Sequence, residues 1–244
     1  ELKREFMKSK TGLIGIAILS SLVIVSLIAA TTIPIDTFKQ WNNPNNWISY
    51  PKATMPIWVN YFLEDKIPEH IIMENPSTIT KKDVISVTSH QFAIEYTYDD
   101  FPNDFIYEFS AEYTDSPLLQ ISVIRPDQNE MLLLSTSLPY SDEKVIHHER
   151  IFSTDDSIKK NAQIESAKMK LFRDGVSSED LIFADKYGHV LKGNYLFLVN
   201  LYGIEDYTKI IDSKLILGGK AFGIMGTDEL RRDLIVGLLW GTPL

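Results

Sequence analysis

Histidine and carboxylate side chains are the residues of this sequence best suited to acid–base or metal chemistry. His147 and His148 are adjacent, and neighbouring residues of a strand point to opposite faces, so the two cannot grip one ion together. The carboxylate pairs at 99–100 and 155–156 fall at turn or cap positions, whereas a calcium site needs several converging oxygens. Surface or packing roles are therefore favoured for these groups. The other histidines are scattered: His70, His90 and His189.

Sequence motifs for catalysis are lacking as well. The chain has no cysteine, which excludes disulfides, thiolate metal sites and cysteine catalysis. It contains no Gly-x-Ser-x-Gly, phosphate loop or dinucleotide fingerprint, and the glycine-rich run at 218–223 lacks the spacing of a phosphate cradle. We therefore expect no catalytic residue, metal or cofactor in this chain. A surface hydrolase is a lesser alternative, which an activity screen of residues 41–219 would test.

Charge balance narrows the class of partner. Lys and Arg number 24 against 33 Asp and Glu, which gives a net charge of −9. A nucleic-acid-binding surface must be basic to meet phosphates, so nucleic acid is not an expected partner. Apolar residues make up 44% of 244 positions, enough for a sizeable core in one or two domains.

A long uncharged run near the N-terminus predicts a membrane-spanning helix. No residue from Gly12 to Ile33 is charged, and at about 1.5 Å per residue this run reaches roughly 33 Å, enough to cross the hydrocarbon core. The preceding residues 1–11 are basic, which places them in the cytoplasm, and Pro34 stops the helix. A cleaved signal peptide is the main alternative, but its apolar region is shorter and its cleavage pattern is only weakly present here.

The range 34–83 is expected to be an extracytoplasmic linker. It is rich in Pro and Asn, which oppose regular helix. Its aromatic side chains suit either the membrane–water interface or packing beneath the next domain. These aromatic residues are Trp41, Trp47, Tyr50 and Trp58.

Residues 84–219 have the pattern of a mainly β domain. In the stretch 104–113, Phe105 starts an alternating apolar set that predicts a buried side, and Glu108 belongs to a mostly polar set that predicts a solvent-facing side. Strands separated by turn signals at this spacing favour an antiparallel sandwich. One helix is expected within 153–175, capped by Ser153 or Asp155 and ended by Gly175. The expected strands are 83–90, 91–98, 104–113, 118–125, 130–138, 144–152, 180–203 and 213–219.

The range 220–244 carries the most specific pattern, "GTDELRRDLIVGLLWG". Thr227 or Asp228 can cap a helix, and the acidic Asp228 and Glu229 suit its positive end. Apolar residues then recur at helical spacing, which predicts an amphipathic helix lying along the membrane surface before the chain enters the bilayer. An ordinary amphipathic helix docked on the sandwich is the alternative. The apolar positions are Leu230, Leu234, Ile235, Leu238 and Leu239.

This segment resembles the pre-membrane motif of the inner-membrane permease subunits of dipeptide, oligopeptide and nickel ABC importers. That motif runs Gly-Thr-Asp, two residues, Gly-Arg-Asp, an apolar stretch and a further glycine. Arg231 departs from it by standing where the family usually has glycine, and the pairs 236–237 and 242–243 depart as well. The basic, glycine-containing entry into the first apolar run is also similar to the family. The matching residues are Gly226, Thr227, Asp228, Arg232, Asp233 and Gly241.

The resemblance implies a multi-pass permease subunit of the inner (cytoplasmic) membrane, with residues of about 34–240 outside the cytoplasm and 41–219 as an inserted domain. Such a subunit imports di- or oligopeptides or related solutes by alternating access, and further membrane helices are expected after Leu244. The implied partners are a second permease subunit, two ATPase subunits that bind ATP and Mg²⁺, an extracytoplasmic solute-binding protein and membrane lipid. A single-span, membrane-anchored β-sandwich sensor or adhesion module is the alternative.

Overall fold

The computed structural model describes residues 9–32, 34, 36, 39–82, 85–171, 175–203 and 208–241. The chain divides into two compact units. We call residues 1–57 together with 222–244 the terminal unit, and Trp58–Ala221 the sandwich unit. The sandwich unit is therefore an insertion within the terminal unit along the sequence.

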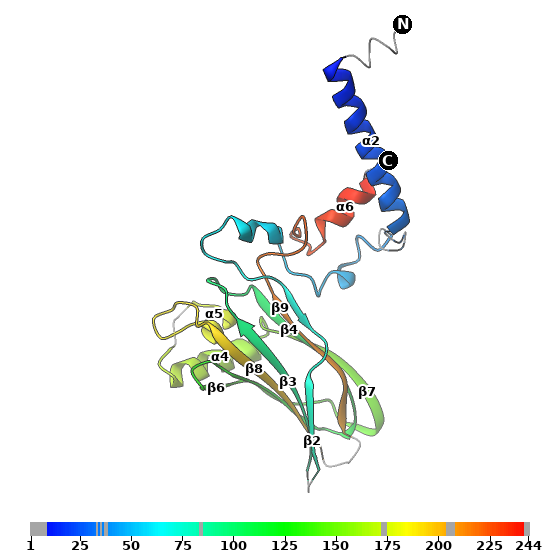
Figure 1. Cartoon of the computed structure of the whole chain (residues 1–244). Helices are drawn as coiled ribbons and strands as arrows, with labels where there is room; N and C mark the ends of the chain where they lie inside the picture. Colours follow the sequence, from blue (N-terminus) through cyan, green and yellow to red (C-terminus); the bar gives the residue numbers. More distant parts are fainter. Residues whose placement is uncertain are drawn as a thin grey trace. The chain divides into compact units, whose positions relative to one another are not determined.

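The terminal unit contains a long apolar helix, α2 (Lys10–Thr32), drawn in blue in Figure 1. Its side chains are largely uncovered, and Leu19 and Leu27 are 64% and 62% exposed. Among the described residues it is the one helix long and apolar enough to cross a membrane, over Lys10–Ala29. The helix predicted at 12–33 is thus present to residue 32, and its crossing of a membrane stays a prediction.

The tail of the terminal unit differs from our expectation. We predicted a helix that begins near Thr227 or Asp228, and this was wrong, because helix α6 spans only Leu234–Gly241. Arg231, inside the predicted helix, has a φ of +65°, a left-handed conformation through which a right-handed helix cannot continue. The unit also contains a short 3₁₀ helix, η1 (Pro44–Asn46).

Two antiparallel sheets form the sandwich unit (Figure 1), which confirms the predicted sandwich. The strand orders are β1-β9-β4-β7 and β2-β3-β8-β5-β6. The strands are β1 (Ile71–Met73), β2 (Ser77–Lys82), β3 (Ser86–Tyr96), β4 (Asp104–Asp115), β5 (Leu118–Ile124), β6 (Glu130–Ser137), β7 (Ser141–Phe152), β8 (Gly193–Gly203) and β9 (Lys209–Gly218). The helices of this region are η2 (Ile57–Tyr61), α4 (Asp156–Lys168) and α5 (Ser178–Phe183).

The alternation predicted for 104–113 is present in β4. One face is buried in the core between the sheets, with exposed fractions of at most 2%, and the other carries partly exposed polar residues. Ile106 is the exception on the polar side, since it is 1% exposed and pairs with Phe152 and Ile216 of the neighbouring strands. The buried set is Phe105, Tyr107, Phe109, Ala111 and Tyr113.

Several element boundaries correct the sequence-based expectation. The strands expected at 83–90 and 91–98 are a single strand, β3, because His90 and Gln91 continue the ladder with β8 without a turn. Residues 180–183, expected as strand, end helix α5, whose start is capped by the Ser177 hydroxyl accepting from the Asp180 N–H at 3.1 Å.

The linker and the predicted helix also have different limits. Strands β1 and β2 lie inside the range 34–83 that we treated as a linker. Helix α4 ends at Lys168 rather than near Gly175, since Lys170 has a φ of +61°. Asp155 is its N-cap residue by position, but its carboxylate accepts from the Phe152 N–H instead, at 2.9 Å.

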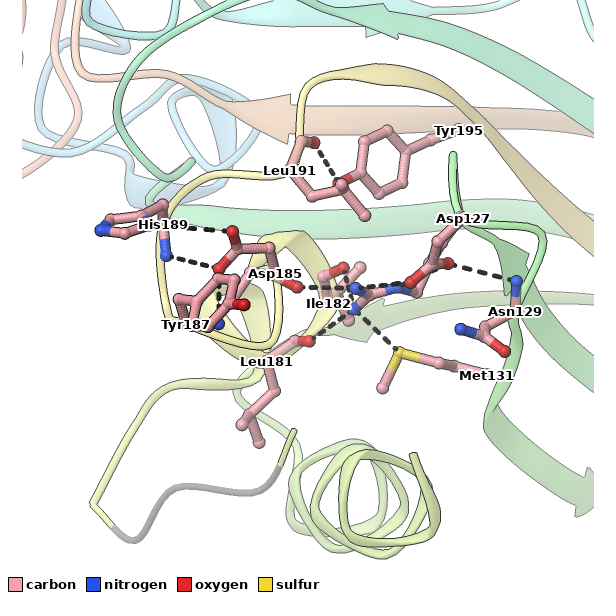
Figure 2. Close-up of polar contacts among 12 residues, drawn as sticks. Asp127, Asn129, Met131, Leu181, Ile182, Asp185, Tyr187, His189, Leu191 and Tyr195 are labelled. Atoms are coloured by element: carbon pink, nitrogen blue, oxygen red, sulfur yellow. Dashed lines mark hydrogen bonds and ion pairs between the residues drawn. The ribbon is translucent and has the colours of Figure 1, made fainter. Parts of the chain in front are cut away.

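A buried arginine ties α5 to the sheet. The guanidinium of Arg125 is fully buried and donates to the carbonyls of Leu181, Ile182 and Ala184 at 3.0, 2.9 and 2.6 Å. Figure 2 shows Leu181 and Ile182 near Asp127, whose carboxylate lies 3.3 Å from Arg125 Nη2. The cation thereby satisfies the carbonyls at the end of α5, which would otherwise be buried without a donor.

Candidate functional site

The structure brings five of the six predicted motif residues together in one joint of the terminal unit. Gly241 lies apart at the end of α6, where a Cβ would meet nothing within 4 Å. The pairing of residues 53–57 with 222–228 builds the joint, because the Phe222 N–H donates to the Met55 carbonyl at 2.8 Å. The motif residues in the joint are Gly226, Thr227, Asp228, Arg232 and Asp233.

Two threonines lock the joint. The Thr54 and Thr227 hydroxyls are 2.9 Å apart, and each also accepts from the backbone N–H of the other residue, at 3.2 and 3.1 Å. The Thr227 hydroxyl donates to the Pro51 carbonyl at 2.7 Å, and its residue is only 4% exposed. We call Thr54 and Thr227 the threonine lock. It joins the segment before the sandwich to the segment after it.

Glycine is needed at position 226 for steric reasons. Its φ is +76°, and a Cβ there would lie 2.1 Å from the Thr54 carbonyl oxygen. Any side chain would therefore push the two paired segments apart. The glycine of the predicted motif thus has a structural explanation in this chain.

Asp228 and Arg232 form an ion pair that closes the following turn. Arg232 Nε and Nη2 both lie 2.7 Å from Asp228 Oδ2, while Asp228 Oδ1 accepts from the N–H groups of Leu230 and Arg232 at 2.9 Å. Partial burial raises the pKa of Asp228, but the hydrogen bonds from Arg232 and the backbone outweigh it, so the pKa lies below its ordinary value. Asp228 therefore caps a turn rather than a helix.

Asp233 is the residue that caps α6. Its carboxylate accepts from the Ile235 N–H at 3.0 Å, and the Leu234 N–H bonds back to the Gly226 carbonyl at 3.1 Å. Burial raises the pKa of Asp233, and the bond from Ile235 only partly offsets this. The two aspartates of the motif thus sit in opposite electrostatic environments.

Arg231 occupies the motif position where the resembling family usually has glycine. Its φ of +65° is the left-handed conformation that glycine adopts without strain. The guanidinium compensates by donating to the Tyr50 carbonyl at 2.6 Å. Arginine therefore stands at this motif position in place of glycine, but the backbone still has the left-handed conformation that glycine favours.

Aromatic residues surround the joint, and Gly237 is a contact residue whose role the sequence analysis did not predict, as is Thr54. The rings of Trp41 and Trp47, and of Trp47 and Tyr50, lie 5.3 Å apart, so they pack on each other within the terminal unit. The Arg232 guanidinium covers the Trp41 ring at 4.8 Å. A Cβ at Gly237 would lie 2.9 Å from that ring, and a glycine inside an apolar helical stretch was the available signal.

A charged groove lies on the outer face of β4, β7 and β9 in the sandwich unit. Glu108 accepts from Arg150 Nε at 2.7 Å and lies 3.4 Å from Lys214 Nζ. Ser110 Oγ and His148 Nδ1 are 2.7 Å apart in the same groove. Burial raises the pKa of Glu108, but Arg150 and Lys214 lower it more, so it stays below its ordinary value. The groove offers alternating donors and acceptors to a polar ligand.

The other chemically capable residues have structural contacts. His147 lies against the core rings of Phe109 and Tyr113 while His148 faces the groove, which confirms that the two point to opposite faces. His90 is buried beside Ser213 Oγ at 2.6 Å, and burial lowers its pKa more than Asp212 raises it.

The carboxylate pairs likewise make ion pairs or caps. Asp99 and Asp100 lie 2.5 and 2.7 Å from the Nζ atoms of Lys192 and Lys220. Asp155 receives the Phe152 N–H as described above. These contacts agree with the packing and surface roles favoured from the sequence.

Comparison with known proteins finds only solved structures of low similarity to this chain. No family model and no curated protein matches the chain. The tailspike protein 4 enzymatically active domain of bacteriophage CBA120 is 11% identical, with 62% of this chain and 18% of that chain covered and a TM-score of 0.25. TmCBM61, solved in complex with beta-1,4-galactotriose, is 8% identical with coverage of 62% and 85% and a TM-score of 0.24.

A third solved structure has similarly low sequence identity and TM-score. The non-crystalline cellulose specific carbohydrate-binding module CBM28 is 7% identical, with 65% of this chain and 81% of that chain covered and a TM-score of 0.22. At TM-scores of this size the likenesses carry no argument about function. The functional conclusion therefore rests on the residues of this chain.

Proposed function

We propose that this chain is a membrane-anchored protein that holds a β-sandwich recognition module on the extracytoplasmic side. The observation that carries the proposal is the uncovered apolar surface of α2, which only an apolar surrounding stabilises. A core helix of the same composition would be mostly buried, whereas 11% of the span at Lys10–Ala29 is buried. The basic residues before α2 support a cytoplasmic N-terminus.

The sandwich unit supports the recognition part of the proposal. Its core is made of its own residues, and the residues of the charged groove come from β4, β7 and β9. The groove around Glu108, Arg150 and His148 presents fixed donors and acceptors, which suits a polar ligand or the polar surface of another protein.

Site-directed labelling tests the topology cleanly because the chain has no cysteine of its own. Ser9→Cys lies just before α2, and Tyr187→Cys lies on an exposed turn of the sandwich unit. A membrane-impermeant maleimide added to intact cells should label Tyr187→Cys and should label Ser9→Cys only after lysis. Labelling of both positions in intact cells, or loss of Ser9 from the mature protein by cleavage, would contradict the anchor.

We propose a second candidate, a permease subunit of an ABC importer for peptides or related solutes, because of one specific observation. The threonine lock joins the flanks of the sandwich, and α6 follows directly with exposed Leu234 and Leu238. This arrangement supports a sandwich inserted between two apolar helices, as the motif resemblance implies. The left-handed turn at Arg231 supports the same candidate.

Transport by the intact gene product separates the two candidates. Deletion of the gene should lower ATP-dependent uptake of labelled di- and oligopeptides if the chain belongs to a permease, and the wild-type gene should restore uptake. Uptake should stay low when the deleted gene is replaced by the Gly226→Val variant, because the valine side chain clashes with the Thr54 carbonyl. Uptake that is unchanged by deletion would leave the anchored recognition module as the function.

A further inference from the structure

A pocket of about 330 Å³ lies entirely within the terminal unit, beside the motif joint. Its apolar wall consists of the indoles of Trp41 and Trp47 with Ile48 and Leu230, and its polar wall carries Lys52, Arg231 and Arg232. The volume falls in the range of ligand pockets, roughly 300–1,000 Å³. The contacts of the motif joint account for Arg231 and Arg232 but not for Lys52, which lines the same pocket.

The charge of the pocket is opposite to that of the whole chain. The chain carries a net charge of −9, yet three cationic side chains line this pocket against one carboxylate, that of Glu229. Two of the cations are fixed in place. Arg232 is held by Asp228 and stacks on Trp41, and Arg231 is held by the Tyr50 carbonyl.

Lys52 and Glu229 form the adjustable part of the pocket. Lys52 Nζ lies 3.2 Å from a Glu229 carboxylate oxygen, and their side chains are 57% and 76% exposed. An exposed pair of this kind contributes little to stability, so an anion can displace the carboxylate from the lysine at small cost. The two residues therefore set the affinity of the pocket for an anion without holding the fold together.

The surroundings of the pocket identify the class of anion. Trp41 forms part of the pocket wall and also contacts Gly237 of α6, whose neighbours Leu234 and Leu238 are exposed apolar side chains. A ligand with an anionic head and apolar chains fits both walls, because its head meets the cations while its chains follow the helix. We propose that this pocket binds the headgroup of an anionic phospholipid. The inference rests on the membrane anchoring proposed above.

Titration with defined lipids tests the pocket in the full chain, purified in a non-ionic detergent. Native mass spectrometry would follow binding of short-chain phosphatidylglycerol, with phosphatidylcholine and inorganic phosphate as comparison probes. We expect phosphatidylglycerol to bind at least about fivefold more tightly than either probe, since one basic residue near an anionic lipid contributes about a fivefold change. Equal binding of the two lipids overturns the proposal, and equal binding of inorganic phosphate identifies a free-anion site instead.

A pair of neutral substitutions with opposite effects sharpens the test. Lys52→Gln should weaken phosphatidylglycerol binding about fivefold, and Glu229→Gln should strengthen it by a similar factor. Lys186→Gln, on an exposed turn of the sandwich unit beside Tyr187, is the matched control and should leave binding unchanged. Unchanged binding in Lys52→Gln, with circular dichroism equal to that of the wild type, contradicts the proposal.

The result is separable from the topology experiment. Binding in detergent does not require α2 to cross a bilayer, so the pocket can pass its test when the labelling experiment fails. In the converse case, correct labelling of Ser9→Cys and Tyr187→Cys with equal binding of both lipids leaves the anchor standing and removes only the lipid site.

Discussion

The terminal unit and the sandwich unit use apolar residues in opposite ways. In the sandwich unit the large apolar side chains of the core lie between the sheets, and Phe105, Tyr107 and Phe197 are at most 1% exposed. In the terminal unit they are outside, along α2 and α6, while polar groups such as the Thr227 hydroxyl are buried. The sandwich unit is stabilised by its own core, whereas the terminal unit exposes apolar side chains along α2 and α6.

This difference shows where directional bonds matter most. A sandwich core is held by non-directional burial of large area, so single hydrogen bonds contribute a small share of its stability. The joint of the terminal unit has little core, so the threonine lock and the Asp228–Arg232 pair determine its geometry. Substitutions of similar chemistry should therefore have different consequences in the two units.

The largest effect is expected where the sandwich does depend on polar contacts. Arg125→Ala removes a buried cation and leaves the carbonyls of Leu181 and Ala184 without their donor. We expect a loss of about 3–5 kcal/mol in the free energy of unfolding, measured by denaturant titration of the full chain.

Arg125→Lys and Leu22→Ala serve as controls for that measurement. Lysine keeps the charge but not the planar set of donors, so it should restore only part of the stability. Leu22 of α2 is half-exposed, and its truncation should leave unfolding of the sandwich unchanged. A loss with Leu22→Ala as large as that with Arg125→Ala would break the contrast between the units.

A smaller and local effect is expected at the threonine lock. Thr227→Val removes the hydroxyl that accepts from the Thr54 N–H and donates to the Pro51 carbonyl. A lost buried hydrogen bond costs about 1–3 kcal/mol, so the Thr54 amide should exchange with solvent roughly 5–150-fold faster. Hydrogen exchange measures this directly, and Thr227→Ser should behave like the wild type. Unchanged exchange in Thr227→Val would show that the lock is dispensable.

The pH dependence of the two units should have opposite sign at one carboxyl in each. The pKa of Asp228 is below its ordinary value of 3.8, so its stabilisation is complete above that value and is lost as pH falls through the folded pKa. Burial raises the pKa of Glu179, to which the Asp104 charge adds, while hydrogen bonds from Ser153 and Ser177 partly offset it. Its contribution is complete below the unfolded pKa and is lost as pH rises through the folded one.

Isosteric amides separate these two contributions. Asp228→Asn should flatten the acid-induced rise in exchange at the Thr54 amide. Glu179→Gln should flatten the loss of sandwich stability on raising the pH from acid toward neutral, measured by denaturant titration. Steeper pH profiles in either variant would contradict the assigned direction.

The smallest effect is expected at Arg231. Glycine relieves the left-handed conformation but loses the bond to the Tyr50 carbonyl, so Arg231→Gly should change stability of the joint by less than about 1 kcal/mol. Arg231→Ala keeps the strained backbone conformation and loses the hydrogen bond. The Thr54 amide should therefore exchange faster in Arg231→Ala than in Arg231→Gly. The reverse order would show that backbone strain is not the deciding term.

Much of the sandwich could be predicted because alternation is a local signal. The pattern around Phe105, Glu108 and Tyr113 identified the buried face of β4 without knowledge of its neighbours. Strands β1 and β2 were not predicted, because they lie in a range rich in Pro and Asn. Strand β1 is also short and pairs with β9, far along the chain. The burial of Arg125 was also hidden, because its partners are backbone carbonyls that carry no sequence signature.

The candidate site was predicted in identity but not in geometry. The motif spacing selected Thr227, Asp228 and Asp233, yet it placed a helix across Arg231, whose left-handed conformation interrupts a right-handed helix. The partner of Thr227 is Thr54, which lies before the whole sandwich in sequence, so no local pattern links them. Long-range pairing of this kind becomes visible only when the chain is folded.

The close approach of the two flanking segments also means that the sandwich unit can be exchanged as a whole. Met55 and Phe222 are bonded neighbours in the terminal unit, and Pro68 accepts from the N–H groups of Lys220 and Ala221 in the sandwich unit. Entry and exit of the insert therefore fall on adjacent chain segments, the arrangement in which domain insertion is best tolerated. A short turn from Ile57 to Phe222 should leave the hydrogen bonds of the joint in place, so replacing the sandwich at this point should leave the joint intact.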